Sequence, residues 1–304
     1  MTTTVETQYS INGILLLNKP KGISSNAALQ KAKYLFGAKK AGHTGSLDPL
    51  ATGMLPICFG EATKICEYLL NADKCYETTG RLGIKTNTSD STGEVIFCAA
   101  ECHVNNAQLL EVLEKHKGKI KQIPSMFSAL KHNGTPLYRL AREGIEIERK
   151  ARDILISHLQ LEQFDGESFS LIVKCSKGTY IRNLIEDIGD ALNVGAHMTR
   201  LHRLYTSGFQ NSPMYSLDEL QNMPHPQKLN CLIPMDQAID YLVPVTLTDS
   251  EVISIRQGRI LSYKSNVSEG DYVRLYNIKS EFVGIGIVLS HGDIKAKRLL
   301  SFSP

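Results

Sequence analysis

Long apolar runs are missing from this sequence of 304 residues. A membrane-spanning helix needs about 18 consecutive apolar residues, and the best candidate, Phe282–Leu289, is much shorter. The first segment, MTTTVETQYS, also lacks the basic and then apolar pattern of a secretory signal. We therefore expect a cytoplasmic protein with no membrane association.

Motifs for disulfides, metals and two common catalytic sites are also missing. The seven cysteines form no Cys-x-x-Cys pair, so neither a disulfide framework nor a zinc ribbon is indicated. The nine histidines form no His-Glu-x-x-His motif, and Cys98, Cys102 and His103 lack a second half that would complete a zinc site. No Gly-x-Ser-x-Gly motif and no P-loop ending is present. We expect neither a metal nor a cofactor.

The formal net charge of +3 hides one strongly basic segment. Residues 115–152 contain ten Lys or Arg and three Glu, a net charge of +7. The rest of the chain contains 24 basic and 28 acidic residues, a net charge of −4. Concentrated positive charge is typical of a polyanion-binding surface, although a solvated basic surface has the same composition.

Apolar patterning predicts a mixed α/β protein. Strands are expected at 11–17, 76–84, 154–164 and 171–180, and helices at 27–36, 109–115 and 181–192. Ser24, Ser25 and Asn26 offer N-cap side chains for the first helix, and Gly37 ends it.

Two segments differ from this pattern. Residues 124–152 are rich in basic side chains and predict an insertion that reaches off the sheet. After Pro244, short alternating segments separated by glycine turns predict a small β-barrel of about sixty residues. We therefore expect a catalytic domain at 1–245 and a barrel at 246–304.

The densest unusual stretch is the glycine-rich segment GHTGSLDPLATG, Gly42–Gly53. Asp48 precedes Pro49, and a proline disfavours helical backbone at the residue before it. Asp48 is therefore expected on an extended or turned backbone. From these residues alone, it is either a structural turn residue or a functional carboxylate held in a fixed position.

Four motifs occur in an order that resembles the TruB family of tRNA pseudouridine synthases: Leu17–Asn26, Gly42–Gly53, Lys74–Glu77 and Gly178–Arg182. The resemblance covers nearly the whole chain. It implies an α/β (α+β) fold: a pseudouridine synthase catalytic domain with a mixed, largely antiparallel central sheet, an RNA-binding insertion at about 124–152, and a C-terminal PUA barrel. Asn18 and Ser125 depart from the family's usual aspartate and proline, but neither position carries the chemistry.

The resemblance also assigns the chemistry. It makes Asp48 the catalytic carboxylate, which breaks the glycosidic bond of uridine so that the base rejoins the sugar through carbon 5. Whether Asp48 attacks the sugar or removes a sugar proton stays open. Arg182 matches the arginine that pairs with this aspartate, and Tyr76 matches the aromatic ring that stacks on the target base.

Further residues match positions that contact the RNA or line the pocket. His43 matches a histidine that contacts the RNA loop beside the extruded nucleotide, and Tyr180 and Leu201 match the pocket wall. Core packing is the competing interpretation for Tyr76, Tyr180 and Leu201. Lys19 either contacts RNA or supports the catalytic loop.

The resemblance implies that the chain modifies uridine 55 in the T-loop of tRNA, with the T-arm stem-loop as its RNA partner. No metal and no membrane are expected. No guide RNA is expected either, because guide-dependent relatives carry terminal extensions that this chain lacks. We expect a monomer. Two alternatives remain: an RNA-binding or tRNA-folding chaperone with incidental or additional modification activity, and a metal-dependent RNA hydrolase.

Overall fold

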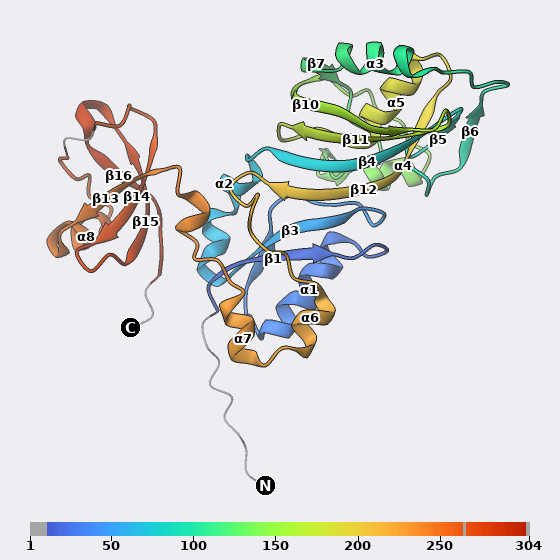
Figure 1. Ribbon diagram of the computed structural model, residues 1–304. Helices are drawn as coiled ribbons and strands as arrows, with labels where there is room; N and C mark the ends of the chain where they lie inside the picture. Colours follow the sequence, from blue (N-terminus) through green and yellow to red (C-terminus); the bar gives the residue numbers. More distant parts are fainter. Residues whose placement is uncertain (1–10, 264–265, 302–304) are drawn as a thin grey trace, which may run out of the picture.

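A computed structural model describes residues 11–263 and 266–301 (Figure 1). Residues 1–10, which contain no predicted secretory signal, lie outside the described residues, as do 264–265 and 302–304 of the predicted barrel. Among the described residues, no helix is long and apolar enough to cross a membrane.

A large mixed sheet forms the centre of the molecule, with the strand order β1-β3-β12-β4-β11-β10-β7 and β2 paired to β3. Only the β12–β3 pairing is parallel within this described sheet. This confirms the predicted mixed, largely antiparallel sheet. Its strands are β1 (Gly13–Lys19), β2 (Ala41–His43), β3 (Thr52–Phe59), β4 (Lys74–Leu82), β7 (Gly118–Gln122), β10 (Arg152–Phe164), β11 (Ser168–Cys175) and β12 (Ala196–Thr206).

Helices cover the two halves of this sheet (Figure 1). Of the three predicted N-cap candidates, Ser24 caps the first helix by accepting a hydrogen bond from the Ala27 amide. Gly37 ends the helix as predicted, in the left-handed conformation. This helix lies beside two short helices near β1, and two further helices lie near β10 and β12. They are α1 (Ser25–Phe36), α6 (Leu217–Asn222), α7 (His225–Asn230), α3 (Asn106–Lys115) and α5 (Ile181–Ala191).

Strand β1 is buried on both faces, which separates two apolar cores. Leu15 and Leu17 pack into the main core, whereas Ile14 and Leu16 pack into a second core on the opposite face. The second core also contains Ile285 of the C-terminal sheet. This core therefore attaches the C-terminal part of the chain to the face of the large sheet that Ile14 and Leu16 occupy.

The C-terminal part forms a four-stranded sheet with the order β13-β14-β15-β16, seen as a separate lobe in Figure 1. It has its own apolar core, to which α8 (Asp249–Arg256) contributes Ile255. The predicted domain boundary at 245/246 falls inside β13, and closure of the sheet into a barrel stays a prediction. The strands are β13 (Val243–Leu247), β14 (Tyr272–Asn277), β15 (Phe282–Val288) and β16 (Ile294–Leu299).

Short elements complete the described chain. A hairpin follows β4, and a smaller hairpin with one helix lies in residues 123–151, between β7 and β10. These elements are β5 (Ile84–Thr86), β6 (Val95–Cys98), β8 (Lys131–His132), β9 (Thr135–Pro136) and α4 (Leu137–Arg142). Helix α2 (Cys66–Leu70) and three 3₁₀ turns, η1 (Gly60–Ile65), η2 (Gln237–Ile239) and η3 (Ser290–Gly292), connect the remaining strands.

Two of the differences between the sequence predictions and the structure lie close to the site. The strand predicted at 171–180 ends at Cys175, because the chain turns at Gly178, whose φ is +81°, before Tyr180 caps α5. The sequence also did not predict β12, although this strand lies at the centre of the sheet. Its segment AHMTRLHRLYT contains several polar residues, so apolar periodicity does not reveal a central strand.

Candidate active site

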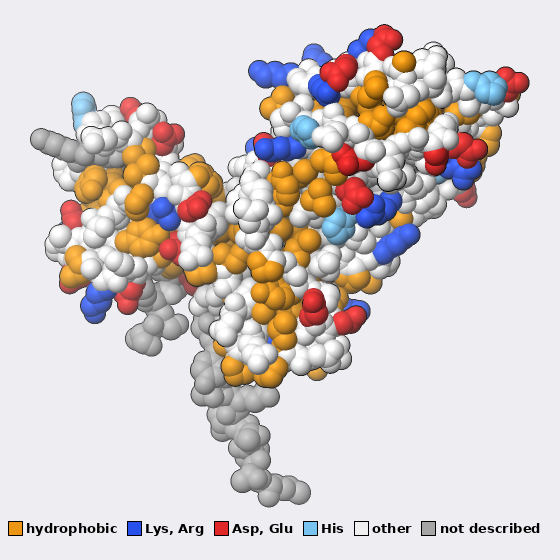
Figure 2. Space-filling model, in the orientation of Figure 1, with side chains coloured by type: hydrophobic (Ala, Val, Ile, Leu, Met, Phe, Trp, Pro, Cys, Tyr) orange, Lys and Arg blue, Asp and Glu red, His pale blue; other side chains and the backbone are white. Residues whose placement is uncertain are grey.

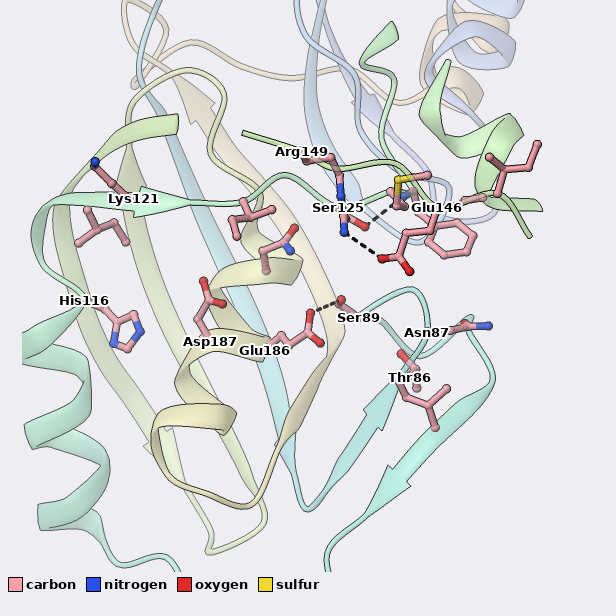
Figure 3. Close-up of a pocket in the computed structure, with 18 of the residues that line it drawn as sticks. Thr86, Asn87, Ser89, His116, Lys121, Ser125, Glu146, Arg149, Glu186 and Asp187 are labelled. Carbon is pink, nitrogen blue, oxygen red and sulfur yellow. Dashed lines mark hydrogen bonds and ion pairs between the residues drawn. The ribbon is translucent and has the colours of Figure 1, made fainter. Parts of the chain in front are cut away.

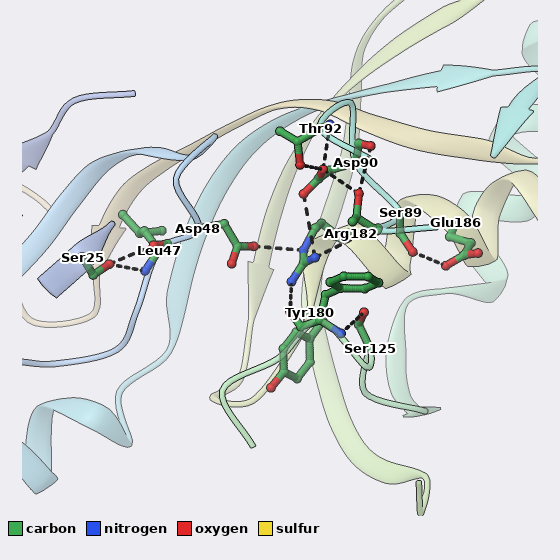
Figure 4. Close-up of polar contacts among 12 residues, drawn as sticks. Ser25, Leu47, Asp48, Ser89, Asp90, Thr92, Ser125, Tyr180, Arg182 and Glu186 are labelled. Carbon is green, nitrogen blue, oxygen red and sulfur yellow. Dashed lines mark hydrogen bonds and ion pairs between the residues drawn. The ribbon is translucent and has the colours of Figure 1, made fainter. Parts of the chain in front are cut away.

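Asp48 lies on the loop of residues 44–51 between β2 and β3, on non-helical backbone as predicted. The start of α1 holds this loop in place (Figure 4). The buried Ser25 hydroxyl accepts a hydrogen bond from the Leu47 amide at 2.7 Å and donates one to the Leu47 carbonyl at 2.9 Å. The residue before Asp48 is therefore fixed to a helix by both of its backbone polar groups.

Lys19 supports the segment that leads into α1. Its side chain is fully buried, and its ammonium donates hydrogen bonds to the carbonyls of Pro20 and Ile23 at 2.9 and 2.8 Å. Burial lowers the pKa of Lys19 to about 8, while the nearby Asp48 carboxylate raises it. Because RNA cannot reach this ammonium, the structure favours the supporting role for Lys19.

Arg182 and Asp48 form the central ion pair of the site (Figure 4). Arg182 Nε lies 2.9 Å from Asp48 Oδ2, although the two residues come from α5 and from the loop after β2. The Arg182 side chain is 6% exposed, whereas the Asp48 side chain is 40% exposed. The pair therefore presents the carboxylate, and not the guanidinium, to an incoming substrate.

The remaining donors of Arg182 bind two other parts of the chain. Nη1 donates to the Thr88 carbonyl at 3.0 Å, and Nη2 donates to the Phe127 carbonyl at 2.8 Å. Asp90 Oδ2 lies 3.8 Å from Nη1. Arg182 is thus held by the turn after β5 and by residues 123–151, which leaves its guanidinium little freedom to leave Asp48.

Asp90 is itself fixed within the turn between β5 and β6. Its Oδ1 atom accepts hydrogen bonds from the Thr88 hydroxyl at 2.9 Å and from the Thr92 hydroxyl and amide at 2.6 and 2.9 Å. The residue is buried, so a second carboxylate contributes to the orientation of Arg182 without contacting the open site. The sequence analysis missed Asp90. The available signal was the turn-forming run NTSDST, which by itself indicates only a loop.

The surroundings of Asp48 change its acidity. Burial raises the pKa of the Asp48 carboxyl, Arg182 lowers it, Asp90 raises it, and Lys19 lowers it; the net change is upward. A carboxylate with a raised pKa is a stronger proton acceptor and nucleophile once it is ionised.

The other predicted site residues lie on neighbouring elements. Tyr180 stands at the start of α5, where its backbone amide and carbonyl bond the Gln122 side chain at 2.8 and 3.0 Å. Tyr76 of β4 and Leu201 of β12 are 8% and 7% exposed and belong to the main core. Their burial fits either core packing or a closed pocket wall, so their predicted contacts with the target base stay predictions.

His43 ends β2 and is partly buried. Its Nδ1 atom is buried and has no hydrogen-bond partner among the described residues. Burial and then the charge of Arg203 lower the pKa of His43. Both effects favour the neutral imidazole, which suits stacking or a hydrogen bond with a base better than an ion pair with phosphate.

Strand β3, which follows the loop that carries Asp48, requires glycine near its start. Gly53 has φ +97°, and a Cβ atom there would lie 2.3 Å from the carbonyl oxygen of Arg203 in the adjacent strand. We expect Gly53→Ala to lower the free energy of unfolding by about 3 kcal/mol through backbone strain and this clash. Urea unfolding measures the change. Gly22→Ala is the matched control, because Gly22 also has positive φ but no atom lies within 4 Å of its Cβ position; an equal loss in both variants would contradict the clash.

A cavity of about 840 Å³ lies between residues 123–151 and α5 (Figure 3). Arg149 lies on one side of this cavity, where it donates to the Pro124 carbonyl at 3.1 Å, and Glu186 and Asp187 of α5 lie on the other. Burial raises the pKa of Asp187 to about 6. Residues 123–151 therefore contact the site through the Phe127 carbonyl, and the cavity separates other parts of this segment from α5.

Positive charge gathers near this segment. Figure 2 shows Lys and Arg side chains, with Asp and Glu side chains among them, on the surface beside β7 and α3. Lys119 and Lys121 of β7 and Lys131, Arg139 and Arg142 of the segment are exposed. Among the described residues, no group of three or more His, Cys, Asp and Glu side chains is arranged to hold a metal ion.

Comparison with known proteins gives matches along almost the entire chain. The family model "TruB family pseudouridylate synthase (N terminal domain)" matches residues 33–181, and "tRNA pseudouridylate synthase B C-terminal domain" matches residues 182–240. A third model, "Pseudouridine synthase II TruB, C-terminal", matches residues 244–300.

Full-length relatives and one solved structure agree with these matches. The chain is 73% identical to tRNA pseudouridine synthase B of Legionella pneumophila (strain Corby), covering 99% of each chain, and 47% identical to that of Tolumonas auensis, covering 95% and 92%. A chain in the crystal structure of a Cbf5-Nop10-Gar1 complex shares the fold, with a TM-score of 0.74 at 24% identity, covering 97% of this chain and 87% of that one. The chain therefore belongs to the TruB family of pseudouridylate synthases.

Proposed function

We propose that the chain converts uridine to pseudouridine at position 55 in the T-loop of tRNA, with Asp48 as the catalytic carboxylate. The observation that carries this proposal is the 2.9 Å pair of Asp48 with a buried Arg182, which presents one oriented carboxylate at a partly open site. Relatives with 73% identity are named tRNA pseudouridine synthase B, which supports tRNA as the substrate. The proposal includes action as a cytoplasmic monomer, without guide RNA, metal or cofactor.

The proposed reaction is an isomerisation in which no atom is lost. The C1′–N1 bond breaks and its electron pair leaves with the base on N1. A C1′–C5 bond then forms, C5 releases its proton, and N1 gains one. Asp48 either attacks C1′ or removes a sugar proton, and both routes require the ionised carboxylate that Arg182 stabilises.

The remaining site residues have supporting roles in this proposal. Tyr76 stacks on the base that has left the RNA helix, while Tyr180 and Leu201 form the walls of its pocket. The neutral imidazole of His43 contacts the RNA loop from which the nucleotide is extruded.

The exposed cations of residues 115–152 supply salt-dependent affinity for the T-arm. Changing Lys131, Arg139 and Arg142 together to Gln is expected to reduce the slope of log K against log salt by about 2 to 3, because each phosphate contact contributes about 0.7 to 0.9. Filter binding between 50 and 300 mM salt measures the slope. A control with Lys31, Lys39 and Lys279 changed to Gln removes the same exposed charge elsewhere; an equal reduction in the control would contradict this location of the interface.

Tritium release tests the proposed function. The purified chain is incubated with a T-arm stem-loop whose uridines carry tritium at carbon 5, with chelator present and no guide RNA. We expect release of one tritium per stem-loop, and none when cytidine replaces the target uridine. Chain cleavage that the chelator abolishes would instead indicate a metal-dependent RNA hydrolase.

The basic segment also suits a protein that folds tRNA, and the same preparation distinguishes the two functions. Tight binding without tritium release, in the wild type and in Asp48→Ala alike, would favour the tRNA-folding chaperone. Tritium release by the wild type together with tRNA folding by Asp48→Ala would show that the chain has both activities, because folding does not require the carboxylate.

A further inference from the structure

Arg203 is a fully buried arginine that the proposed chemistry has not yet used. It lies in β12, is 1% exposed, and has the largest volume among the fully buried side chains. Among the described residues, no carboxylate forms an ion pair with it. An unpaired buried guanidinium lowers stability relative to an apolar side chain of similar size, so packing does not explain its presence.

Two buried lysines near Arg203 add to the loss of stability that its unpaired charge causes. Lys19 and Lys74 are both buried, and the pKa of each is lowered to about 8, mainly by burial and further by the charge of Arg203. The ammonium groups are bound by backbone carbonyls and not by carboxylates. Arg203 therefore belongs to a buried cationic cluster next to the loop of residues 44–51, which carries Asp48.

The contacts of Arg203 join the separate parts of the site. Nε donates to the Met54 carbonyl of β3 at 2.6 Å, and Nη2 donates to the Gly45 carbonyl of the catalytic loop at 3.2 Å. In the sheet, Arg203 lies directly opposite Tyr76 of β4 and Gly53 of β3.

The Arg203 guanidinium also influences the Tyr76 phenol on the neighbouring strand. Burial raises the pKa of the Tyr76 phenol, whereas Arg203 lowers it through its charge and through a side-chain hydrogen bond. One buried side chain thus bonds the loop that carries Asp48 and comes from the residue directly opposite the predicted base-stacking residue Tyr76 in the sheet.

We infer that Arg203 is a positioning residue for the isomerisation: its guanidinium fixes the Tyr76 ring and the Asp48 loop relative to each other. This inference rests on the proposed function. During the reaction the base must stay against Tyr76 while C1′ stays near Asp48, and a displacement of about 1 Å between reacting groups lowers a rate by about 10²-fold. The forked, planar guanidinium suits this task because it bonds partners in several directions at once.

Single-turnover kinetics on the T-arm stem-loop test the inference. Arg203→Met is expected to lower the maximal rate by about 10²-fold and to change KM by less than about threefold, since no exposed RNA-binding group is altered. Arg203→Lys is expected to recover about tenfold of this loss, because an ammonium keeps the charge but not the fork. Arg200→Met is the matched control: Arg200 lies in the same strand, is exposed and pairs with Glu77, and its rate should stay within about twofold.

A double-mutant cycle separates positioning of Tyr76 from a general structural effect. If Arg203 acts through the Tyr76 hydroxyl, the fold-loss of rate caused by Arg203→Lys will be at least about fivefold smaller in a Tyr76→Phe background than in the wild type. Losses that multiply in the double variant would overturn the inference, as would an unchanged rate in Arg203→Met. The cycle uses the lysine variant, so it remains informative if the methionine variant fails to fold. An inactive wild type would instead refute the proposed function, and the inference with it.

Discussion

Replacing Asp48 with asparagine is expected to lower the rate of pseudouridine formation on the order of 10⁴-fold, with RNA affinity within about threefold of the wild type. Asparagine has the size of aspartate but can neither attack C1′ nor accept a sugar proton. The hydrogen bonds of Ser25 to the backbone of Leu47 do not involve the carboxylate, so the loop should keep its position.

The measurement for Asp48 is single-turnover tritium release, together with filter binding of the same stem-loop. Asp218→Asn is the matched control, because Asp218 is an exposed aspartate of α6 and its loss removes the same charge. An Asp48→Asn variant that releases tritium within about tenfold of the wild-type rate would remove Asp48 from the chemistry, since loss of an essential group costs far more.

Replacing Arg182 with methionine is expected to lower the rate about 10³-fold. The change removes the ion pair to Asp48 and both hydrogen bonds to the Thr88 and Phe127 carbonyls. It also leaves Asp90 as a buried carboxylate without its cation, which adds a structural cost of about 3 kcal/mol. Arg182→Lys should retain more activity, because it keeps the charge near Asp48.

Thermal unfolding must accompany the Arg182 kinetics, since part of the loss could come from a destabilised fold. Arg81→Met is the matched control, because the Arg81 side chain is half exposed and, among the described residues, forms an ion pair only with Glu167, at 3.5 Å. If Arg182→Met is folded and retains nearly the wild-type rate, Arg182 has no part in orienting the catalytic carboxylate.

The Arg182 variants should also shift the pH dependence in a defined direction. The pKa of Asp48 is raised by burial, and Arg182 is the largest influence that lowers it. Because activity requires the ionised carboxylate, the rate falls as the pH drops through this pKa. Removing the Arg182 charge raises the pKa of Asp48 further. Arg182→Lys keeps a positive charge beside Asp48, so the acid limb of its maximal rate should stay near that of the wild type. In Arg182→Met it should move to higher pH; a shift to lower pH would contradict the assignment.

Local sequence signals were sufficient for part of this architecture. The caps Ser24 and Gly37 predicted the ends of α1, and Pro49 predicted non-helical backbone at Asp48, because capping and proline sterics act within a few residues. The order of four motifs was sufficient to predict the family and the mixed, largely antiparallel sheet.

Strand β12 shows where local signals fail. Its polar residues look like those of a loop, yet the strand lies between β3 and β4 and buries Arg203. A strand in this position is stabilised by ladder partners far away in the sequence, so its own apolar periodicity carries little information. The strand predicted at 171–180 is too long for a related reason. Tyr180 continues the apolar pattern of the strand, but the chain turns at Gly178, and Tyr180 becomes the N-cap residue of α5.

The sequence by itself determined the family, the helix caps and the identity of the carboxylate that we propose as catalytic. The resemblance also predicted Arg182 as the partner of that carboxylate, but only the tertiary structure decided how this pair is held and which other groups surround it. Arg182 reaches Asp48 because α5 packs beside the loop after β2, and Asp90 and Arg203 join the site from a hairpin turn and a central strand. These contacts span from about ninety to more than 150 positions of the chain, and the energies of charges and hydrogen bonds depend on distance in space, which sequence spacing does not give.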